Sequence, residues 1–185
     1  MIGESAVLRG GAQADVFRSA AVYHEIQHFP AWVYVISVSP GLFLLVGASR
    51  QLVSGLPFGA LPMSDAGLAV LTLALLSLPL FLYGLILRME TIVDPGVLTV
   101  SFGTFGWIHR NVRLDEVGGV SVVAFRPIRD FGGWGIRYGK GMWCYNTRGS
   151  AGVLVTTVQG KSFIVGSQTP KLLESALRGL LPPKA

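Results

Sequence analysis

The chain has 185 residues, of which 51% are hydrophobic and only 14% are charged, and its mean hydropathy is +0.55. This balance is too apolar for a typical soluble domain of this length and indicates an integral membrane protein. The net charge is +5, and residues 88–185 hold twelve Lys or Arg against six Asp or Glu; because lipid headgroups are the nearest polyanion for a domain tethered to a bilayer, we expect no nucleic-acid partner.

Residues 1–22 mix small and polar side chains without a sustained period, so we expect a mobile N-terminal tail. The pre-membrane segment 23–30 follows and contains His24, Glu25 and His28, which match the H-E-x-x-H zinc signature. On a helix the two histidines would lie one turn apart and could share a metal, with Glu25 placed to activate the bound water. A membrane zinc metallopeptidase is therefore one alternative function.

Two observations weigh against a zinc site in this segment. Such a site needs a third protein ligand, and the only other histidine is His109. Pro30 and an apolar run follow the motif directly and leave little room for the cleft of a peptidase. In an extended segment the same residues alternate, with the two histidines on one side and Glu25 on the other. We therefore expect no catalytic residue, no metal and no cofactor.

A two-helix transmembrane hairpin is predicted for residues 31–87. Its two runs, 31–48 and 66–87, contain no charged residue, and their lengths lie at or near the roughly 20 residues that a spanning helix needs. Pro40 and Pro79 predict kinks, which membrane helices tolerate when neighbouring groups satisfy the freed carbonyls. The connection between the runs is short and rich in Gly, Pro and Ser, so the helices should be antiparallel.

The positive residues near the spans predict the orientation of the hairpin. Arg18 and Arg88 lie on the side of the termini and Arg50 lies in the loop, which favours termini in the cytoplasm. The single cysteine, Cys144, cannot form an intramolecular disulfide, and this agrees with a cytoplasmic domain. We expect Cys144 to be a small buried residue in a strand.

From residue 88 the pattern changes to short strands with turn residues between them, including a turn at 94–96 and a bulge at 118–119. The last element is a helix with Thr169 as N-cap, Pro170 as its first residue, and apolar residues at i, i+3, i+4 and i+7 from Leu173. Strands closed by one amphipathic helix indicate a small barrel or a bent sandwich. The eight predicted strands cover residues 89–93, 97–102, 107–112, 117–125, 134–138, 142–147, 152–158 and 162–166.

The most distinctive stretch runs from residue 126 to residue 141 and interleaves basic and aromatic residues with glycines and a single acid, Asp130. This composition suits a surface that faces an anionic and partly apolar ligand. The alternative is a glycine-rich hairpin whose rings pack inward and whose cations are solvated. The candidate ligand- or partner-binding residues are Arg126, Arg129, Trp134, Arg137, Tyr138 and Lys140.

Several short motifs are shared with a known family. They are Tyr23, Glu25, Gln27 and Phe29 before the first span, and residues 126–127, 132–137, 145–146, 152–153, 166–168 and 170 after it. On these residues the chain resembles a family of bacterial membrane proteins that join a two-helix hairpin to a pleckstrin-homology-like domain. The resemblance implies an α+β membrane protein of the bacterial inner (cytoplasmic) membrane, in which residues 88–185 form a pleckstrin-homology-like antiparallel β-barrel capped by a C-terminal helix. No activity is carried over with it.

These expectations favour a non-enzymatic module that the hairpin anchors in the membrane. Its basic domain would bind a protein partner or anionic headgroups at the cytoplasmic leaflet. An accessory subunit of a larger membrane complex is the main alternative, because small residues in the second span allow close helix approach. Those residues are Ala66, Gly67, Ala69 and Ala74.

Overall fold

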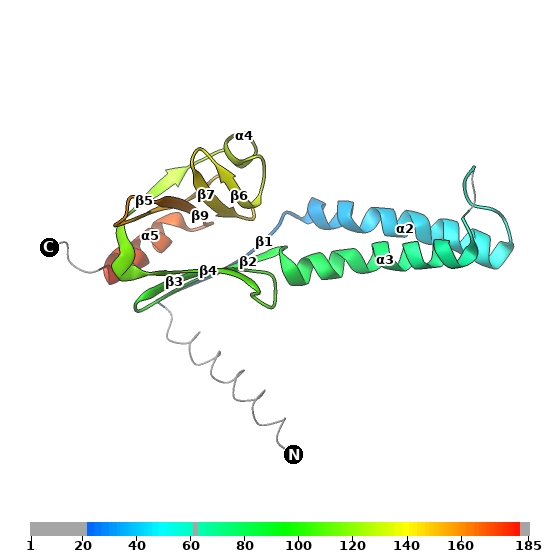
Figure 1. Cartoon of the computed structure of the whole chain (residues 1–185), viewed down its shortest axis with the longest axis horizontal. Coiled ribbons are helices and arrows are strands. Elements are labelled where there is room, and N and C mark those ends of the chain that lie inside the picture. The colour runs from blue at the N-terminus through cyan, green and yellow to red at the C-terminus, as the bar shows by residue number, and fades with distance from the viewer. Residues whose placement is uncertain (1–21, 61–62, 182–185) are drawn as a thin grey trace, which may run out of the picture.

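Two long apolar helices and nine strands dominate the residues that the computed structural model describes, which are 22–60 and 63–181. Figure 1 shows the strands gathered at one end of an elongated molecule, with α2 (Ala31–Ser54) and α3 (Asp65–Leu85) projecting from it as a hairpin. The mobile tail predicted for residues 1–22 lies, except for Val22, outside the described residues. The α+β class and the hairpin of two apolar helices are confirmed.

Both long helices have the length and composition to cross a membrane. With 24 and 21 residues, they measure about 36 and 32 Å at 1.5 Å per residue, against a hydrocarbon core of about 30 Å. Pro40 lies inside α2 and leaves the carbonyl of Ile36 without its usual donor. The Ser39 hydroxyl donates to this carbonyl at 3.0 Å. At the next residue, Gly41, a Cβ would lie 2.8 Å from Leu76, so the helices approach closely here.

The far end of the hairpin is closed by one polar side chain. The Gln51 amide nitrogen donates to the carbonyl of Met63 and to the carboxylate of Asp65, both at 2.8 Å, and its oxygen accepts from the Phe58 N–H at 3.1 Å. Phe58 folds back over Gly47, where a Cβ would come within 2.5 Å of the ring. The short connection is therefore held against the helices.

The first sheet contains four antiparallel strands in the order β1-β2-β3-β4. The register of its first pair runs from Tyr23 opposite Val93 to His28 opposite Arg88, so the hairpin is inserted between two neighbouring strands. The sheet thus begins at Tyr23, before the hairpin, and not at residue 88 as the sequence pattern predicts. The strands are β1 (Tyr23–His28), β2 (Arg88–Asp94), β3 (Val97–Phe102) and β4 (Ile108–Arg113).

The second sheet contains five strands in the order β5-β8-β9-β7-β6. The predicted bulge is present, because the register of the pair β5–β8 shifts between Val117 and Gly119. A short helix, α4 (Pro127–Phe131), was not predicted and separates β5 from β6. The pair β7–β9 is parallel, which differs from the expected antiparallel arrangement. The strands are β5 (Val117–Ala124), β6 (Gly135–Gly139), β7 (Met142–Asn146), β8 (Ala151–Thr157) and β9 (Ser162–Gly166).

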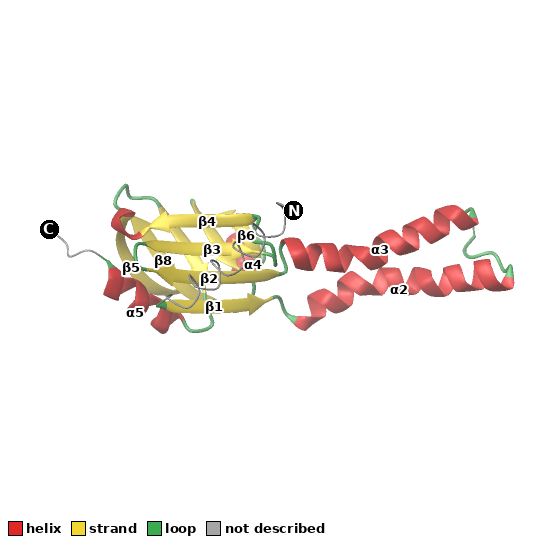
Figure 2. Cartoon of the chain, turned by 90° about the horizontal axis from the view of Figure 1, so that it is seen from below, coloured by secondary structure: helices red, strands yellow, loops and turns green. Residues whose placement is uncertain are grey.

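One hydrophobic cluster joins both sheets to the final helix, α5 (Pro170–Leu180). Leu173 and Leu177 of this helix are fully buried and contribute to the same cluster as Met89 of β2 and Val153 of β8. The helix starts at Pro170, as predicted. Figures 1 and 2 show α5 at the end of the domain remote from the long helices, and α4 on the near side.

The strands do not close into the expected barrel, and this prediction is corrected to two separate sheets. The edge strands β4 and β6 do not pair with each other in the described part of the chain. Side chains stand between them instead, around a cavity of about 160 Å³ that Ile108, Ile136 and Trp143 help to line. Arg110 also lies here, with its guanidinium 4.1 Å from the centre of the Phe163 ring. Bulky groups therefore keep the two edges apart.

Candidate functional site

The helices and the first sheet are joined by two very short connections. β1 ends at His28 and α2 begins at Ala31, while α3 ends at Leu85 and β2 begins at Arg88. Backbone hydrogen bonds continue across both joints: Phe29 N donates to Leu87 O at 3.3 Å, and Thr104 N donates to Gly84 O at 2.9 Å. The Tyr34 hydroxyl also donates to Leu87 O at 3.1 Å. The domain is therefore held in one orientation relative to the hairpin.

Aromatic side chains surround this junction. Trp32, at the start of α2, is 50% exposed and meets the Trp134 ring edge to face at 5.9 Å. Phe105 and Trp107 follow β3, stack on each other at 5.1 Å, and are 66% and 71% exposed. A Cβ at Gly84 of α3 would lie 3.1 Å from the Phe105 ring. Exposed rings thus collect where the two apolar helices meet the sheet domain.

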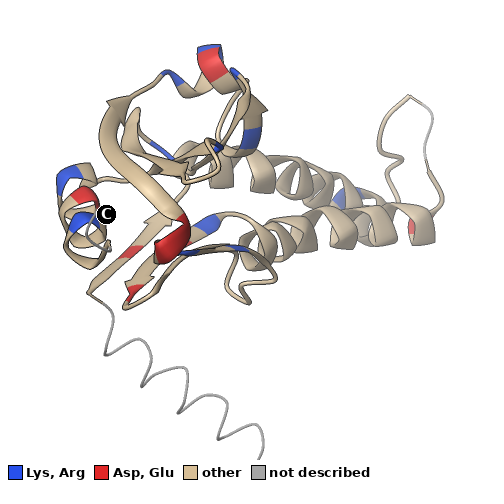
Figure 3. Cartoon of the chain, turned by 60° about the vertical axis from the view of Figure 1, so that its left-hand side comes forward, with Lys and Arg blue, Asp and Glu red and all other residues tan. Residues whose placement is uncertain are grey.

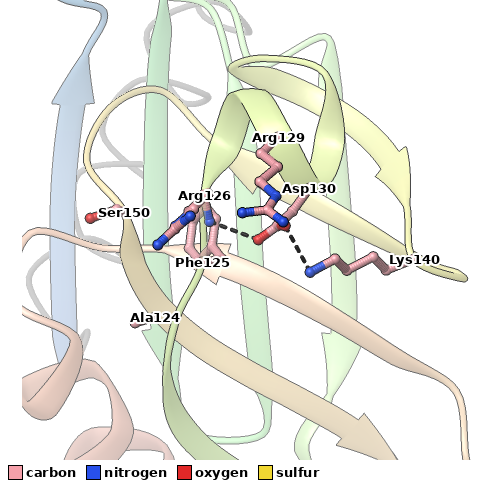
Figure 4. Close-up of a pocket in the computed structure, with 7 residues that line it drawn as sticks. All are labelled: Ala124, Phe125, Arg126, Arg129, Asp130, Lys140 and Ser150. Carbon is pink, nitrogen blue, oxygen red and sulfur yellow. Dashed lines mark hydrogen bonds and ion pairs between the residues drawn. The ribbon is translucent and has the colours of Figure 1, made fainter.

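A basic pocket of about 670 Å³ lies beside α4, and we call it the α4 pocket. Figure 4 shows the side chains of Arg126, Arg129 and Lys140 around Asp130 in this pocket. Lys140 Nζ lies 2.7 Å from Asp130 Oδ1, and the Arg126 backbone N–H donates to Asp130 Oδ2 at 2.8 Å. β6 packs closely on α4, because a Cβ at Gly139, the last residue of β6, would lie 2.4 Å from Asp130 O.

The charges of the α4 pocket do not cancel. The hydrogen bond from Lys140 holds the pKa of Asp130 below its usual range, so this carboxylate is ionised at neutral pH. It neutralises one of the three cations. Within residues 22–60 and 63–181, no salt bridge engages Arg126 or Arg129. In Figure 3, α4 and the strands after it carry several basic positions and a single acidic one.

The structure separates the other three predicted site residues from this pocket. Arg137 Nε donates to Trp134 O at 2.9 Å, and both residues line a different cavity, of about 280 Å³, beside the junction of the helices and the first sheet. Tyr138 is 62% exposed and contacts Trp143. Both residues line a further pocket, which also includes Lys161. The six residues therefore fall into three places. Alternation along the strand accounts for the separation of Arg137 from Tyr138, which are neighbours in β6.

The zinc motif does not have the helical geometry that its hypothesis needs, because its residues form β1. Along a strand, His24 and His28 are separated by about 13 Å. His24 Nε2 lies 2.7 Å from Glu90 Oε1, and the His28 ring stacks on Tyr83 at 6.2 Å. Among the described residues, no three His, Cys, Asp or Glu side chains come together as a metal site.

Glu25 instead joins β1 to the turn before α5. Its carboxylate accepts hydrogen bonds from the Tyr23 hydroxyl, from Ser167 Oγ at 2.7 Å and from Gln168 N at 2.7 Å. Burial is the main cause that raises the pKa of Tyr23 to about 12, so this hydroxyl remains a donor at neutral pH. We call this cluster of Tyr23, Glu25, Ser167 and Gln168 the β1–α5 clasp.

Gln27 extends the β1–α5 clasp toward the second sheet. It is 2% exposed, and its amide nitrogen donates to Gly166 O at 2.8 Å while its oxygen accepts from Thr147 Oγ1 at 3.2 Å. Two segments on opposite sides of the hairpin, residues 23–29 and 166–168, thus meet in space. Their role here is to hold strand and helix together, which sequence spacing alone did not reveal.

No protein-family model and no curated protein matches the chain. The functional proposal is therefore based on the arrangement of the residues in the structure. Its main elements are the direct helix–sheet junction, the exposed rings around it, and the α4 pocket on the near side of the domain.

Proposed function

We propose that the protein is a non-enzymatic, membrane-anchored interaction module. The hairpin spans a bacterial inner membrane with both termini in the cytoplasm, and the sheet domain, of the pleckstrin-homology-like type, lies at the cytoplasmic leaflet, where it binds anionic headgroups or a protein partner. The observation that supports this most is the junction. Because β1 and β2 continue almost directly into α2 and α3, the domain cannot move away from the surface.

The position of the rings and the cations favours headgroups as the ligand. Trp and Tyr side chains prefer the membrane–water interface, and Trp32 and Trp107 occupy the region where the helices leave the domain. α4 lies on this same side (Figures 1 and 2). Each cation near an anionic leaflet contributes about 1 kcal/mol. Arg126 and Arg129 of the α4 pocket are suited to this contact because no described acid forms a salt bridge with them.

The proposed placement predicts how deep each tryptophan lies. Four variants that each retain one of the four tryptophans, with Phe at the other three positions, would be reconstituted with phospholipids brominated near the top of the acyl chains. We expect strong quenching of Trp32, which begins a span, and the weakest quenching of Trp143, which packs against Tyr138 on the second sheet. Equal quenching at both positions, or release of the protein from membranes by alkaline carbonate, would refute the placement.

The α4 pocket predicts a preference for anionic lipid. In nanodiscs, the free energy of unfolding of the wild-type protein should be higher with anionic than with zwitterionic lipid. Arg126→Gln with Arg129→Gln should reduce this difference by about 2 kcal/mol. The matched control is Lys161→Gln with Lys171→Gln, which removes the same charge from two exposed sites outside the α4 pocket. An equal loss in both double variants would show that net charge acts without this pocket.

An accessory subunit of a larger membrane complex is the second candidate. Ala66, Ala69 and Ala74 of α3 are exposed in this chain, and small residues let a further helix approach closely. Gly67 is half-buried and less available. Chemical crosslinking in native membranes, followed by mass spectrometry, would identify a stoichiometric partner of this face. Recovery of a free monomer from a mild detergent would count against this role.

A further inference from the structure

The cavity that Trp134 and Arg137 line lies at the joint between the two long helices and the sheet domain. It measures about 280 Å³, and Phe29 and Ile86 belong to its wall. Phe29 lies between β1 and α2, and Ile86 lies between α3 and β2. Both residues therefore come from the two short connections that lead directly into the proposed spans. We call this space the junction cavity.

Most of the wall of the junction cavity is apolar. Phe29, Ile86, Trp134 and Ile136 supply rings and aliphatic groups, and Arg137 supplies the only charge among the described residues that line it. No acidic side chain belongs to this lining, whereas the α4 pocket includes Asp130. The junction cavity is therefore suited to a molecule that has an apolar part and an anionic group.

Arg137 is oriented and still able to bind. Its Nε donates to Trp134 O at 2.9 Å, which fixes the plane of the guanidinium. Its side chain is exposed, and no hydrogen bond or salt bridge within the described chain uses its two terminal nitrogens. A guanidinium held in one plane with two free nitrogens can bind a phosphate group through paired hydrogen bonds.

We propose that the junction cavity holds the phosphate and glycerol region of one phospholipid, whose acyl chains continue along α2 and α3. This proposal rests on the proposed insertion of the hairpin in a membrane. The occupant follows from position and size: the joint opens where the apolar surface of the helices begins, and whole small-molecule sites usually have about 300 Å³ or more. At about 280 Å³ the cavity suits the polar end of a lipid whose chains remain outside it.

The first measurement is the lipid that remains with the purified full-length protein. After extraction in a mild detergent and size-exclusion chromatography, native mass spectrometry should detect one phospholipid per chain. In mixed micelles, Arg137→Gln should weaken the binding of phosphatidylglycerol about tenfold, because a hydrogen-bonded ion is lost. Ile86→Trp, which fills the cavity, should also reduce the retained lipid. The matched control Lys171→Gln removes the same charge from an exposed site on α5, at the end of the domain remote from the long helices, and should change the affinity less than twofold.

The remaining outcomes test the nature of the ligand, the junction site and the membrane placement separately. Glycerol 1-phosphate has the anionic group but no acyl chains, so it should compete poorly with phosphatidylglycerol; effective competition would overturn the assignment to a phospholipid in favour of a soluble phosphate compound. A protein that resists carbonate extraction but retains no lipid, or an Arg137→Gln variant with unchanged affinity, would refute the junction site alone. Release by carbonate would instead refute the membrane placement itself.

Discussion

Gly103→Ala should lower the free energy of unfolding by about 3 kcal/mol or more, because a methyl group at this position meets fixed backbone while the residue keeps a left-handed conformation. Gly103 has φ +76°, and a Cβ there would lie 2.1 Å from the carbonyl oxygen of Gly84 and 2.5 Å from that of Leu85. Its own N–H donates to Arg88 O at 2.7 Å. The substitution would therefore push the end of α3 away from β3.

The matched control for this substitution is Gly160→Ala. Gly160 has nearly the same backbone angle, φ +80°, but its Cβ would meet no atom within 4 Å. The cost there should be limited to the left-handed conformation, about 1 kcal/mol. Thermal unfolding in detergent, followed by circular dichroism, gives both values. If the two variants lost the same stability, the close contact between the helices and the sheet would not be a rigid one.

Glu25→Ala should destabilise the sheet domain by about 3 kcal/mol, because hydrogen bonds to a charged acceptor contribute about 1.5 to 3 kcal/mol each and are not fully additive. The carboxylate accepts from three donors of the β1–α5 clasp, on Tyr23, Ser167 and Gln168. Its removal takes away the charged acceptor that these donors share at the place where β1 meets α5, although the Tyr23 hydroxyl keeps Thr169 Oγ1 as a partner at 2.9 Å. Denaturant unfolding monitored by circular dichroism measures the loss.

Glu174→Ala provides the comparison for the β1–α5 clasp. Glu174 pairs with Arg178 one turn later on α5 at 2.8 Å, and such surface pairs contribute about 0.3 to 0.5 kcal/mol. Glu25→Ala should therefore cost several times as much. A third variant, Glu25→Gln, tests the zinc hypothesis, since a metallopeptidase would lose activity with this substitution while its stability stayed nearly unchanged. Equal, small losses in both alanine variants would show that the clasp does not stabilise the domain.

The sequence predicted the elements whose signals are local. Two long runs without charge gave the hairpin, the Asp94-Pro95-Gly96 turn gave the pair β2–β3, and Pro170 marked the start of α5. Each of these signals lies within one segment, so no tertiary contact is needed to interpret it. The start of the first sheet was placed too late, because the partners of β1 lie beyond the hairpin and their pairing leaves no mark on the pattern of a six-residue strand.

The candidate site was predicted in composition but not in arrangement. The stretch that begins at Arg126 does contain the α4 pocket, yet Pro127 begins a helical turn there and Gly132 ends it, so the chain reverses direction before β6. Arg137 and Tyr138 are neighbours in the sequence and serve different cavities. Which residues share a pocket depends on the register of β6 with β7, and the sequence does not encode this in a local signal.

The insertion of the hairpin between β1 and β2 has a consequence for biosynthesis. β1 leaves the ribosome first, but its neighbour in the sheet becomes available only after both helices have been made, and Ser167 and Gln168 follow much later. A nascent chain that stops before β9 therefore contains an unfinished sheet with an open strand edge. The domain can reach its final form only after β9 and the turn before α5 have been made, so on the proposed placement the hairpin can enter the membrane before the domain folds.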